Sequence, residues 1–139
     1  ADRIDRLPDG SFAIIDYKTG APPSTKEVQR GLAPQLPLEA AILDRGGFAG
    51  VPGATVSELA FWRLSGRRPA GEQRFVLKPG GDARALIDDA AAGLVRLITA
   101  FDRPDQPYHA RPRAWAAPRY SDYVHLARVQ EWQAGEDEA

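Results

Sequence analysis

Two acidic side chains and one lysine near the start of the sequence have the types and spacing that could support chemistry. Asp16 and Lys18 are separated by one residue in Ile-Ile-Asp-Tyr-Lys-Thr-Gly, and Asp2 precedes them. Side chains alternate along a β-strand, so Asp16 and Lys18 would share one face of it. Carboxylate oxygens bind hard cations such as Mg²⁺ or Mn²⁺. The pattern therefore indicates a cation site with an ammonium group beside it.

The elements that would position these residues are two strands joined by a tight turn at Pro8-Asp9-Gly10. Proline presets one φ, aspartate caps the bend and glycine accepts a left-handed φ. A three-residue loop with Gly10 in the bulge gives a register in which paired residue numbers sum to 18, so Ile4 faces Ile14 and Asp2 faces Asp16. Opposed Cβ atoms lie roughly 4.5–5.5 Å apart, and like charges there are destabilising. Two opposed carboxylates suggest a missing cation.

Asp5 is an alternative to Asp2 as the first acidic ligand. Strand alternation places Asp5 on the opposite face, beside Ala13, where an ion pair with a nearby arginine is its ordinary role. The register favours Asp2. A bulge would change the register and bring Asp5 into the site instead.

Length and composition predict an ordinary globular domain. The chain has 139 residues, of which 43% are hydrophobic and 27% charged. We expect one domain over residues 1–134 and a frayed acidic tail over 135–139. The chain begins inside a predicted strand, so we interpret it as a domain excised from a longer protein. No apolar run approaches the roughly 18 residues of a membrane span.

Charge and cysteine content exclude several kinds of partner and cofactor. The net charge of −1 gives no global basic field, so binding of nucleic acid would depend on a local patch. The sequence contains no cysteine, which excludes disulfides, thiolate zinc sites and cysteine-held iron–sulfur clusters. A metal here would be a hard cation on carboxylate oxygens.

The remainder of the chain predicts alternating helices and strands. Ser24 or Thr25 would cap a helix over 26–32, and Glu27 falls three residues after Ser24, which is the capping-box spacing. Pro34 would begin a second helix that carries Gln35. Residues 56–65 and 73–78 would form a second hairpin. Asp82 would cap a long helix over 83–101 with an amphipathic stripe, and 121–132 would form a last short helix. The stripe consists of Leu86, Ala90, Leu94, Leu97 and Phe101.

Three segments together resemble a known nuclease family. They read Ala-Asp-Arg-Ile-Asp, then Ile-Asp-Tyr-Lys-Thr-Gly, then Gln-Leu-Pro-Leu-Glu-Ala. The Asp-x-Lys element with an earlier acid is similar to the PD-(D/E)XK superfamily. The sequence of these three segments resembles the nuclease domain of the AddB subunit of bacterial AddAB helicase–nucleases, with RecB nucleases as relatives.

The resemblance implies a fold, an activity and a partner. The fold would be α/β, a restriction-endonuclease-like mixed sheet flanked by helices and here truncated at its N-terminus. The activity would be that of a Mg²⁺- or Mn²⁺-dependent deoxyribonuclease, an exonuclease that cuts single-stranded DNA during double-strand break repair and recombination. The partner would be an AddA-like helicase subunit, and the location the bacterial cytoplasm, at the nucleoid.

The resemblance also implies roles for particular residues. Asp2 and Asp16 would bind the metal, with the backbone carbonyl of Tyr17 as a third ligand, and Lys18 would orient or deprotonate the attacking water. Gln35 matches the glutamine of the family's Gln-x-x-x-Tyr helix motif. Glu39 stands where that motif has tyrosine. It is either an extra acidic group near the metal or a solvated surface charge, and the second is the commoner role.

A local basic patch is available after Pro104. Four residues there could combine phosphate neutralisation with base stacking, namely Arg111, Arg113, Trp115 and Arg119. The alternative is an ordinary surface loop. A second hypothesis for the whole chain is a non-catalytic module of the same fold that binds DNA or braces a helicase partner.

Overall fold

The computed structural model describes residues 1–66, 68, 70–77, 81–109 and 126 of the chain. The chain divides into two compact units, Ala1–Ala100 and Phe101–Ala139. Three sequence predictions lie outside the described residues: the basic and aromatic segment over 111–119, the helix over 121–132 apart from Leu126, and the tail over 135–139.

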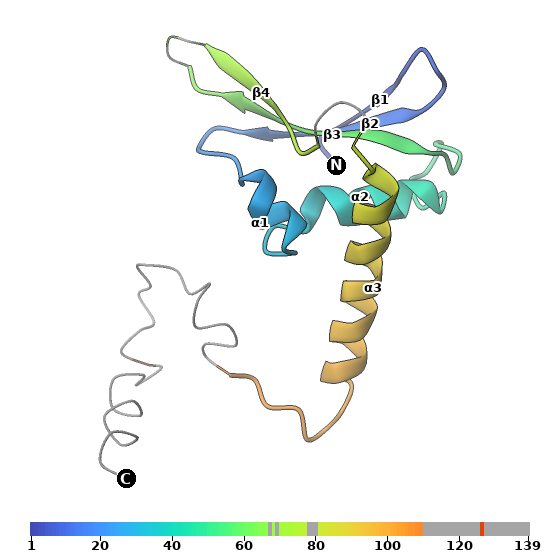
Figure 1. The fold of residues 1–139 in the computed structure, drawn as a ribbon, viewed down its shortest axis with the longest axis vertical. Helices are drawn as coiled ribbons and strands as arrows, with labels where there is room; N and C mark the ends of the chain where they lie inside the picture. The colour runs from blue at the N-terminus through green and yellow to red at the C-terminus, as the bar shows by residue number, and fades with distance from the viewer. Residues whose placement is uncertain (67, 69, 78–80, 110–125, 127–139) are drawn as a thin grey trace. The chain divides into compact units, whose positions relative to one another are not determined.

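The first unit is built on a mixed four-stranded sheet (Figure 1). The strands are β1 (Arg3–Arg6), β2 (Phe12–Lys18), β3 (Val56–Leu64) and β4 (Gly71–Phe75), in the spatial order β1-β2-β3-β4. β2 runs parallel to β3, whereas β1 and β4 are antiparallel to their neighbours. With the flanking helices, this is the predicted α/β mixed-sheet arrangement, which is therefore confirmed.

The first hairpin has the predicted loop and register. The N–H of Leu7 donates to the carbonyl of Ser11 at 2.8 Å, and Gly10 has a φ of 86°. Ile4 pairs with Ile14, as predicted. The turn is held further by the Asp9 carboxylate, which accepts bonds from the backbone and hydroxyl of Ser11, and these bonds lower the pKa of Asp9.

The crossover from β2 to β3 carries two helices, α1 (Thr25–Gln29) and α2 (Gln35–Asp44). Ser24 caps α1 in the predicted capping box with Glu27. α1 ends earlier than the predicted residue 32, because Gly31 adopts a φ of 70° that reverses the chain. α2 begins directly after Pro34, as predicted.

The second hairpin forms as predicted, but β4 lies earlier in the chain than residues 73–78. Gly71 pairs with Leu64 and Phe75 with Ala60. The N–H of Ser65 donates to the carbonyl of Ala70 at 3.3 Å, so the connection is tight. Pairing with β3 thus places the weak strand former Gly71 in the ladder, where its intrinsic preference would not put it.

The core lies between the sheet and α2, with the start of α3 (Ala83–Phe101) added to it. Figure 1 shows α1 and α2 on the same side of the sheet. The largest fully buried side chains among the described residues are Phe61, Ile14, Leu36, Leu43, Leu59, Val28, Val76 and Pro37. This packing fixes the start of α2 against the ends of β2 and β3.

α3 has the predicted bounds, and Asp82 caps it by accepting a bond from the N–H of Ala85 at 3.0 Å. Ile87 in its second turn is buried. The predicted stripe is not buried throughout, however, since Leu94 and Leu97 are 42% and 52% exposed within the described part of the chain. Helical spacing revealed the apolar face but not that only the first half of the helix packs on the core.

Candidate active site

Asp16, Lys18 and Gln35 form a closed set of contacts at the end of β2. Asp16 Oδ1 accepts a hydrogen bond from Gln35 Nε2 at 2.7 Å, and Asp16 Oδ2 lies 2.7 Å from Lys18 Nζ. Lys18 Nζ donates to Gln35 Oε1 at 3.3 Å. The side chain of Asp16 is only 3% exposed, and Asp16 is the one charged residue that is buried among those that the structure describes. The structure thus brings together three of the predicted site residues.

The local fold explains why these three side chains meet. Strand alternation directs Asp16 and Lys18 to the side on which Ile14 packs into the core. Lys18 Nζ lies 5.8 Å from the centre of the Phe61 ring on the neighbouring strand. Gln35 is the first residue of α2, so the packing of that helix on the sheet carries its amide to the end of β2.

Asp2 lies beside the same strand end. Its Oδ2 accepts a hydrogen bond at 2.8 Å from the backbone N–H of Tyr17, the residue between Asp16 and Lys18 in the sequence. Asp5, the alternative acid, pairs with Ala13, and its Oδ1 lies 2.8 Å from Arg3 Nε. Asp5 therefore has the ion pair expected of it, which favours Asp2 as the site residue.

Glu39 lies in the site rather than in solvent. Its Oε1 accepts from Gln35 Nε2 at 3.2 Å and lies 3.0 Å from the backbone nitrogen of Ala1. The side chain is 15% exposed, and Oε2 is buried without a hydrogen-bond partner among the described residues. The interpretation of Glu39 as a solvated charge is therefore wrong. Its i, i+4 spacing from Gln35 was the signal in the sequence, but that spacing does not reveal burial.

The donor set can be compared with what a hard divalent cation requires. Among the described residues, no three His, Asp or Glu side chains gather closely enough to hold a metal ion by themselves. Mg²⁺, however, keeps several waters and commonly binds through one or two carboxylates plus substrate phosphate. Asp16 and Asp2 offer that smaller set, and buried Asp16 Oδ2 has no directed hydrogen bond, only the Lys18 ammonium beside it. The chemical type of these donor groups fits such an ion.

The β2–β3 register adds a residue that the sequence did not reveal. Arg63 pairs with Lys18, so its side chain shares the face of the sheet that carries Asp16. Alternation within β3 was the available signal, but the partner strand and its register could not be read from the sequence. The predicted DNA contacts at Arg111, Arg113, Trp115 and Arg119 lie outside the described residues.

Comparison with known protein families matches residues 1–123 to the PD-(D/E)XK nuclease superfamily. The chain belongs to the PD-(D/E)XK nuclease superfamily. The segment Asp16-Tyr17-Lys18 has the Asp-x-Lys spacing that appears in the name of the superfamily, and the contacts described above are arranged around it. The resemblance is confirmed at the level of the superfamily, and its members typically use divalent metals and act on DNA.

The similar curated proteins have no described function. An uncharacterized protein of Rickettsia bellii is 44% identical over 144 residues, covering 91% of this chain and 16% of the relative. An uncharacterized protein of Rickettsia conorii is 46% identical over 48 residues, covering 34% of this chain and 6% of the relative. The chain thus spans less than a fifth of the length of these relatives. No solved structure matches the chain.

None of the helices in the described part of the chain combines the length and the apolar character that a bilayer crossing demands.

Proposed function

We propose that this chain is a divalent-metal-dependent deoxyribonuclease in which Asp2 and Asp16 hold the metal and Lys18 acts beside it. The observation that carries the proposal is the position of Asp16. A carboxylate that is 3% exposed, at a strand end, lies 2.7 Å from a lysine ammonium and accepts a bond from a glutamine amide. Burying a charge in this way is costly unless it is paired. Such a site is typical of catalysis rather than of stabilisation alone.

Each side chain has a distinct part in phosphodiester hydrolysis. A bound Mg²⁺ or Mn²⁺ would supply a water of lowered pKa and positive charge to offset the phosphate. Asp16 and Asp2, with the carbonyl of Tyr17, would hold that ion. Lys18 would orient or deprotonate the attacking water and stabilise negative charge on the phosphate oxygens.

Gln35 supports this arrangement through its amide. Its Nε2 donates to Asp16 and its Oε1 accepts from Lys18, so the amide can satisfy both groups in only one orientation. A flipped amide would set its oxygen against the carboxylate and its NH₂ against the ammonium. Gln35 therefore holds Asp16 and Lys18 in a fixed relation, which is the preorganisation that catalysis requires.

We further propose a cellular role for the enzyme. It would act as the exonuclease domain of an AddB-like subunit, with Mg²⁺ as its metal, on single strands that an AddA-like helicase partner produces during double-strand break repair. The local similarity of the segments around Asp2, Asp16 and Gln35 to AddB supports this role. The much greater length of the Rickettsia relatives is compatible with a nuclease domain inside a multidomain protein.

Cleavage of DNA tests the activity directly. A 5′-labelled single-stranded oligonucleotide is incubated with the protein in Mg²⁺, in Mn²⁺ and in EDTA, and the products are separated on a denaturing gel. The proposal expects shortened products with either metal and none in EDTA. Binding of the oligonucleotide without any cleavage in either metal would instead support the non-catalytic module.

A further inference from the structure

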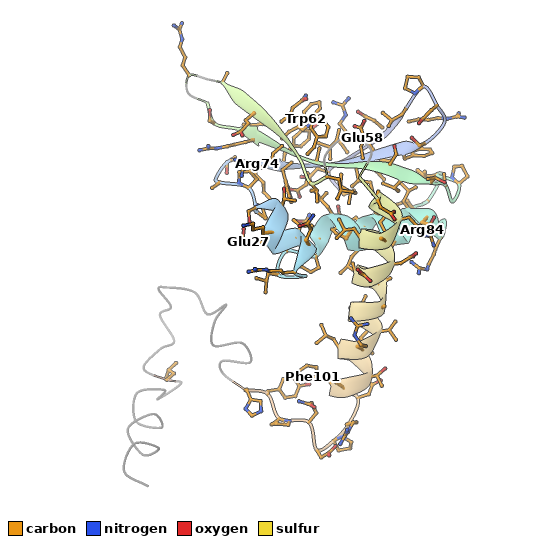
Figure 2. All side chains as sticks on the ribbon, viewed as in Figure 1. Glu27, Glu58, Trp62, Arg74, Arg84 and Phe101 are labelled. Atoms are coloured by element: carbon orange, nitrogen blue, oxygen red, sulfur yellow. The ribbon has the colours of Figure 1, made fainter. Side chains whose placement is uncertain are left out.

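Two arginines of β3 and β4 lie on the same face of the sheet as the proposed active site. Asp16 and Arg74 both pair with Phe61, and Lys18 pairs with Arg63. Paired residues of neighbouring strands point to the same side of a sheet. Figure 2 shows Arg74 on the side of the sheet where the helices lie. Neighbouring strands are about 4.8 Å apart, so Arg63 lies roughly one strand from Lys18 and Arg74 roughly two strands from Asp16.

Arg63 has an unused hydrogen-bond donor. Its Nε is buried and has no hydrogen-bond partner within the described residues. A buried donor left unsatisfied costs about 1–3 kcal/mol. The guanidinium presents its N–H groups in a rigid fork that matches the oxygens of a phosphate. Arg63 therefore has the capacity for an anionic ligand that the described chain does not supply.

Arg74 has only a weak competing partner. Its Nη2 lies 3.3 Å from Glu72 Oε1, and the two side chains are 39% and 49% exposed. An exposed ion pair of this kind contributes about 0–1 kcal/mol. A phosphate can therefore replace Glu72 as the partner of Arg74 at small cost. The acidic groups on this face include Asp16 and Glu39, which both accept hydrogen bonds from Gln35, and Glu72, which pairs with Arg63 in the β3–β4 register.

We propose that Arg63 and Arg74 bind backbone phosphates of the DNA strand beside the phosphate that is cleaved. Arg63 lies beside Lys18 on the neighbouring strand, and Arg74 lies on β4 opposite Phe61, two residues along from Glu72, which pairs with Arg63. Contacts of this type position a strand without reading its sequence. The identity of the ligand rests on the proposed nuclease function, but the binding itself needs neither metal nor hydrolysis. The two claims can therefore fail separately.

The salt dependence of DNA binding tests the proposal. Fluorescence anisotropy of a labelled oligothymidine is measured in EDTA between 50 and 200 mM salt, so that no cleavage occurs. Each phosphate contact on a single strand contributes about 0.7 to the slope of log K against log salt. Arg63→Gln and Arg74→Gln should each reduce the slope by about 0.7, and the double variant by about 1.4. Arg96→Gln, which changes an exposed arginine of α3, is the matched control and should leave the slope unchanged.

A conservative variant separates binding from folding. Arg63→Lys keeps the charge but loses the fork, so it should keep the slope and weaken binding at every salt concentration. If Arg63→Gln does not fold by circular dichroism, Arg74→Gln and Arg63→Lys carry the test. The proposal would be overturned if Arg74→Gln had the same salt slope as the wild type and Arg63→Lys had the same affinity for the oligonucleotide. So would a wild-type protein that does not bind the oligonucleotide.

The outcomes also distinguish this inference from the nuclease assignment. Arginine-dependent binding in a protein that does not cut DNA with Mg²⁺ or Mn²⁺ would support the inference and refute the proposed activity. Metal-dependent cleavage with salt slopes that do not depend on Arg63 or Arg74 would support the proposed activity and refute the inference about the two arginines.

Discussion

Replacing Lys18 by methionine should destabilise the metal-free protein and make its stability depend on a divalent cation. Lys18 Nζ lies 2.7 Å from Asp16 Oδ2, and the side chains of Lys18 and Asp16 are 31% and 3% exposed. Without Lys18, the buried carboxylate keeps the Gln35 amide as its side-chain donor within the described residues. The substitution thus leaves most of a buried negative charge uncompensated.

The size of the effect follows from the burial of the two partners. Breaking a fully buried ion pair costs about 3–5 kcal/mol, and breaking an exposed pair about 0–1 kcal/mol. One partner here is buried and the other is partly exposed, so we expect a loss of about 2 kcal/mol. For a unit the size of Ala1–Ala100, each kcal/mol corresponds to roughly 4–8 °C in Tm, which gives a fall of roughly 8–16 °C.

The assay is thermal unfolding followed by circular dichroism, in EDTA and in Mn²⁺, for the wild type, Lys18→Met and the double variant Asp16→Asn/Lys18→Met. Mn²⁺ should raise the Tm of Lys18→Met more than that of the wild type, because the cation replaces the missing positive charge. The double variant should regain stability in EDTA, because the buried charge is gone, and should lose the gain from Mn²⁺. An unchanged Tm for Lys18→Met in EDTA, or an equal Mn²⁺ gain in the double variant, would refute the reasoning.

Three further predictions concern the surroundings of the site. Glu39→Gln keeps an acceptor for the Gln35 amide and should cut DNA at nearly the wild-type rate. Glu39→Leu removes that acceptor and should cut roughly tenfold more slowly, which corresponds to about 1.4 kcal/mol. Equal cleavage rates for the two variants would show that Glu39 has no part in positioning Gln35. Asp2→Asn should reduce the rise in Tm that Mn²⁺ produces, and an undiminished rise measured by scanning calorimetry would exclude Asp2 as a ligand. Ser24→Ala should cost about 1 kcal/mol in urea unfolding. Bonds from Ser24 lower the pKa of Glu27, so part of the stability difference between the wild type and Ser24→Ala should be present near neutral pH and should vanish as the pH falls through that lowered pKa. A stability difference that grows in acid would contradict this prediction.

Local chemistry made the first hairpin and its register predictable. Pro8-Asp9-Gly10 permits one tight loop, and that loop fixes which residues face each other. Alternation along β2 then places Asp16 and Lys18 together without knowledge of the rest of the sheet. The helix starts at Ser24 and Pro34 were predictable for the same reason, since caps are local signals.

Features that depend on contacts between distant segments were not predictable. The burial of Glu39 requires the packing of α2 on the sheet, which spacing along the helix does not reveal. The position of Arg63 beside Lys18 requires the parallel β2–β3 register, which shifts between Phe12 and Ala13. The exposure of Leu94 reflects the fact that only the first half of α3 packs on the core. Each of these is set by tertiary structure rather than by local preference.

The most direct measurement of the central claim is the rate of single-stranded DNA cleavage in Mg²⁺ by Asp16→Ala and by Lys18→Ala, compared with the wild type. Both variants must first be shown to be folded at the assay temperature by circular dichroism. If Asp16 holds the metal and Lys18 acts on the water, each rate should fall by roughly 10²-fold or more. Folded variants that cut as fast as the wild type would contradict the assignment of this site.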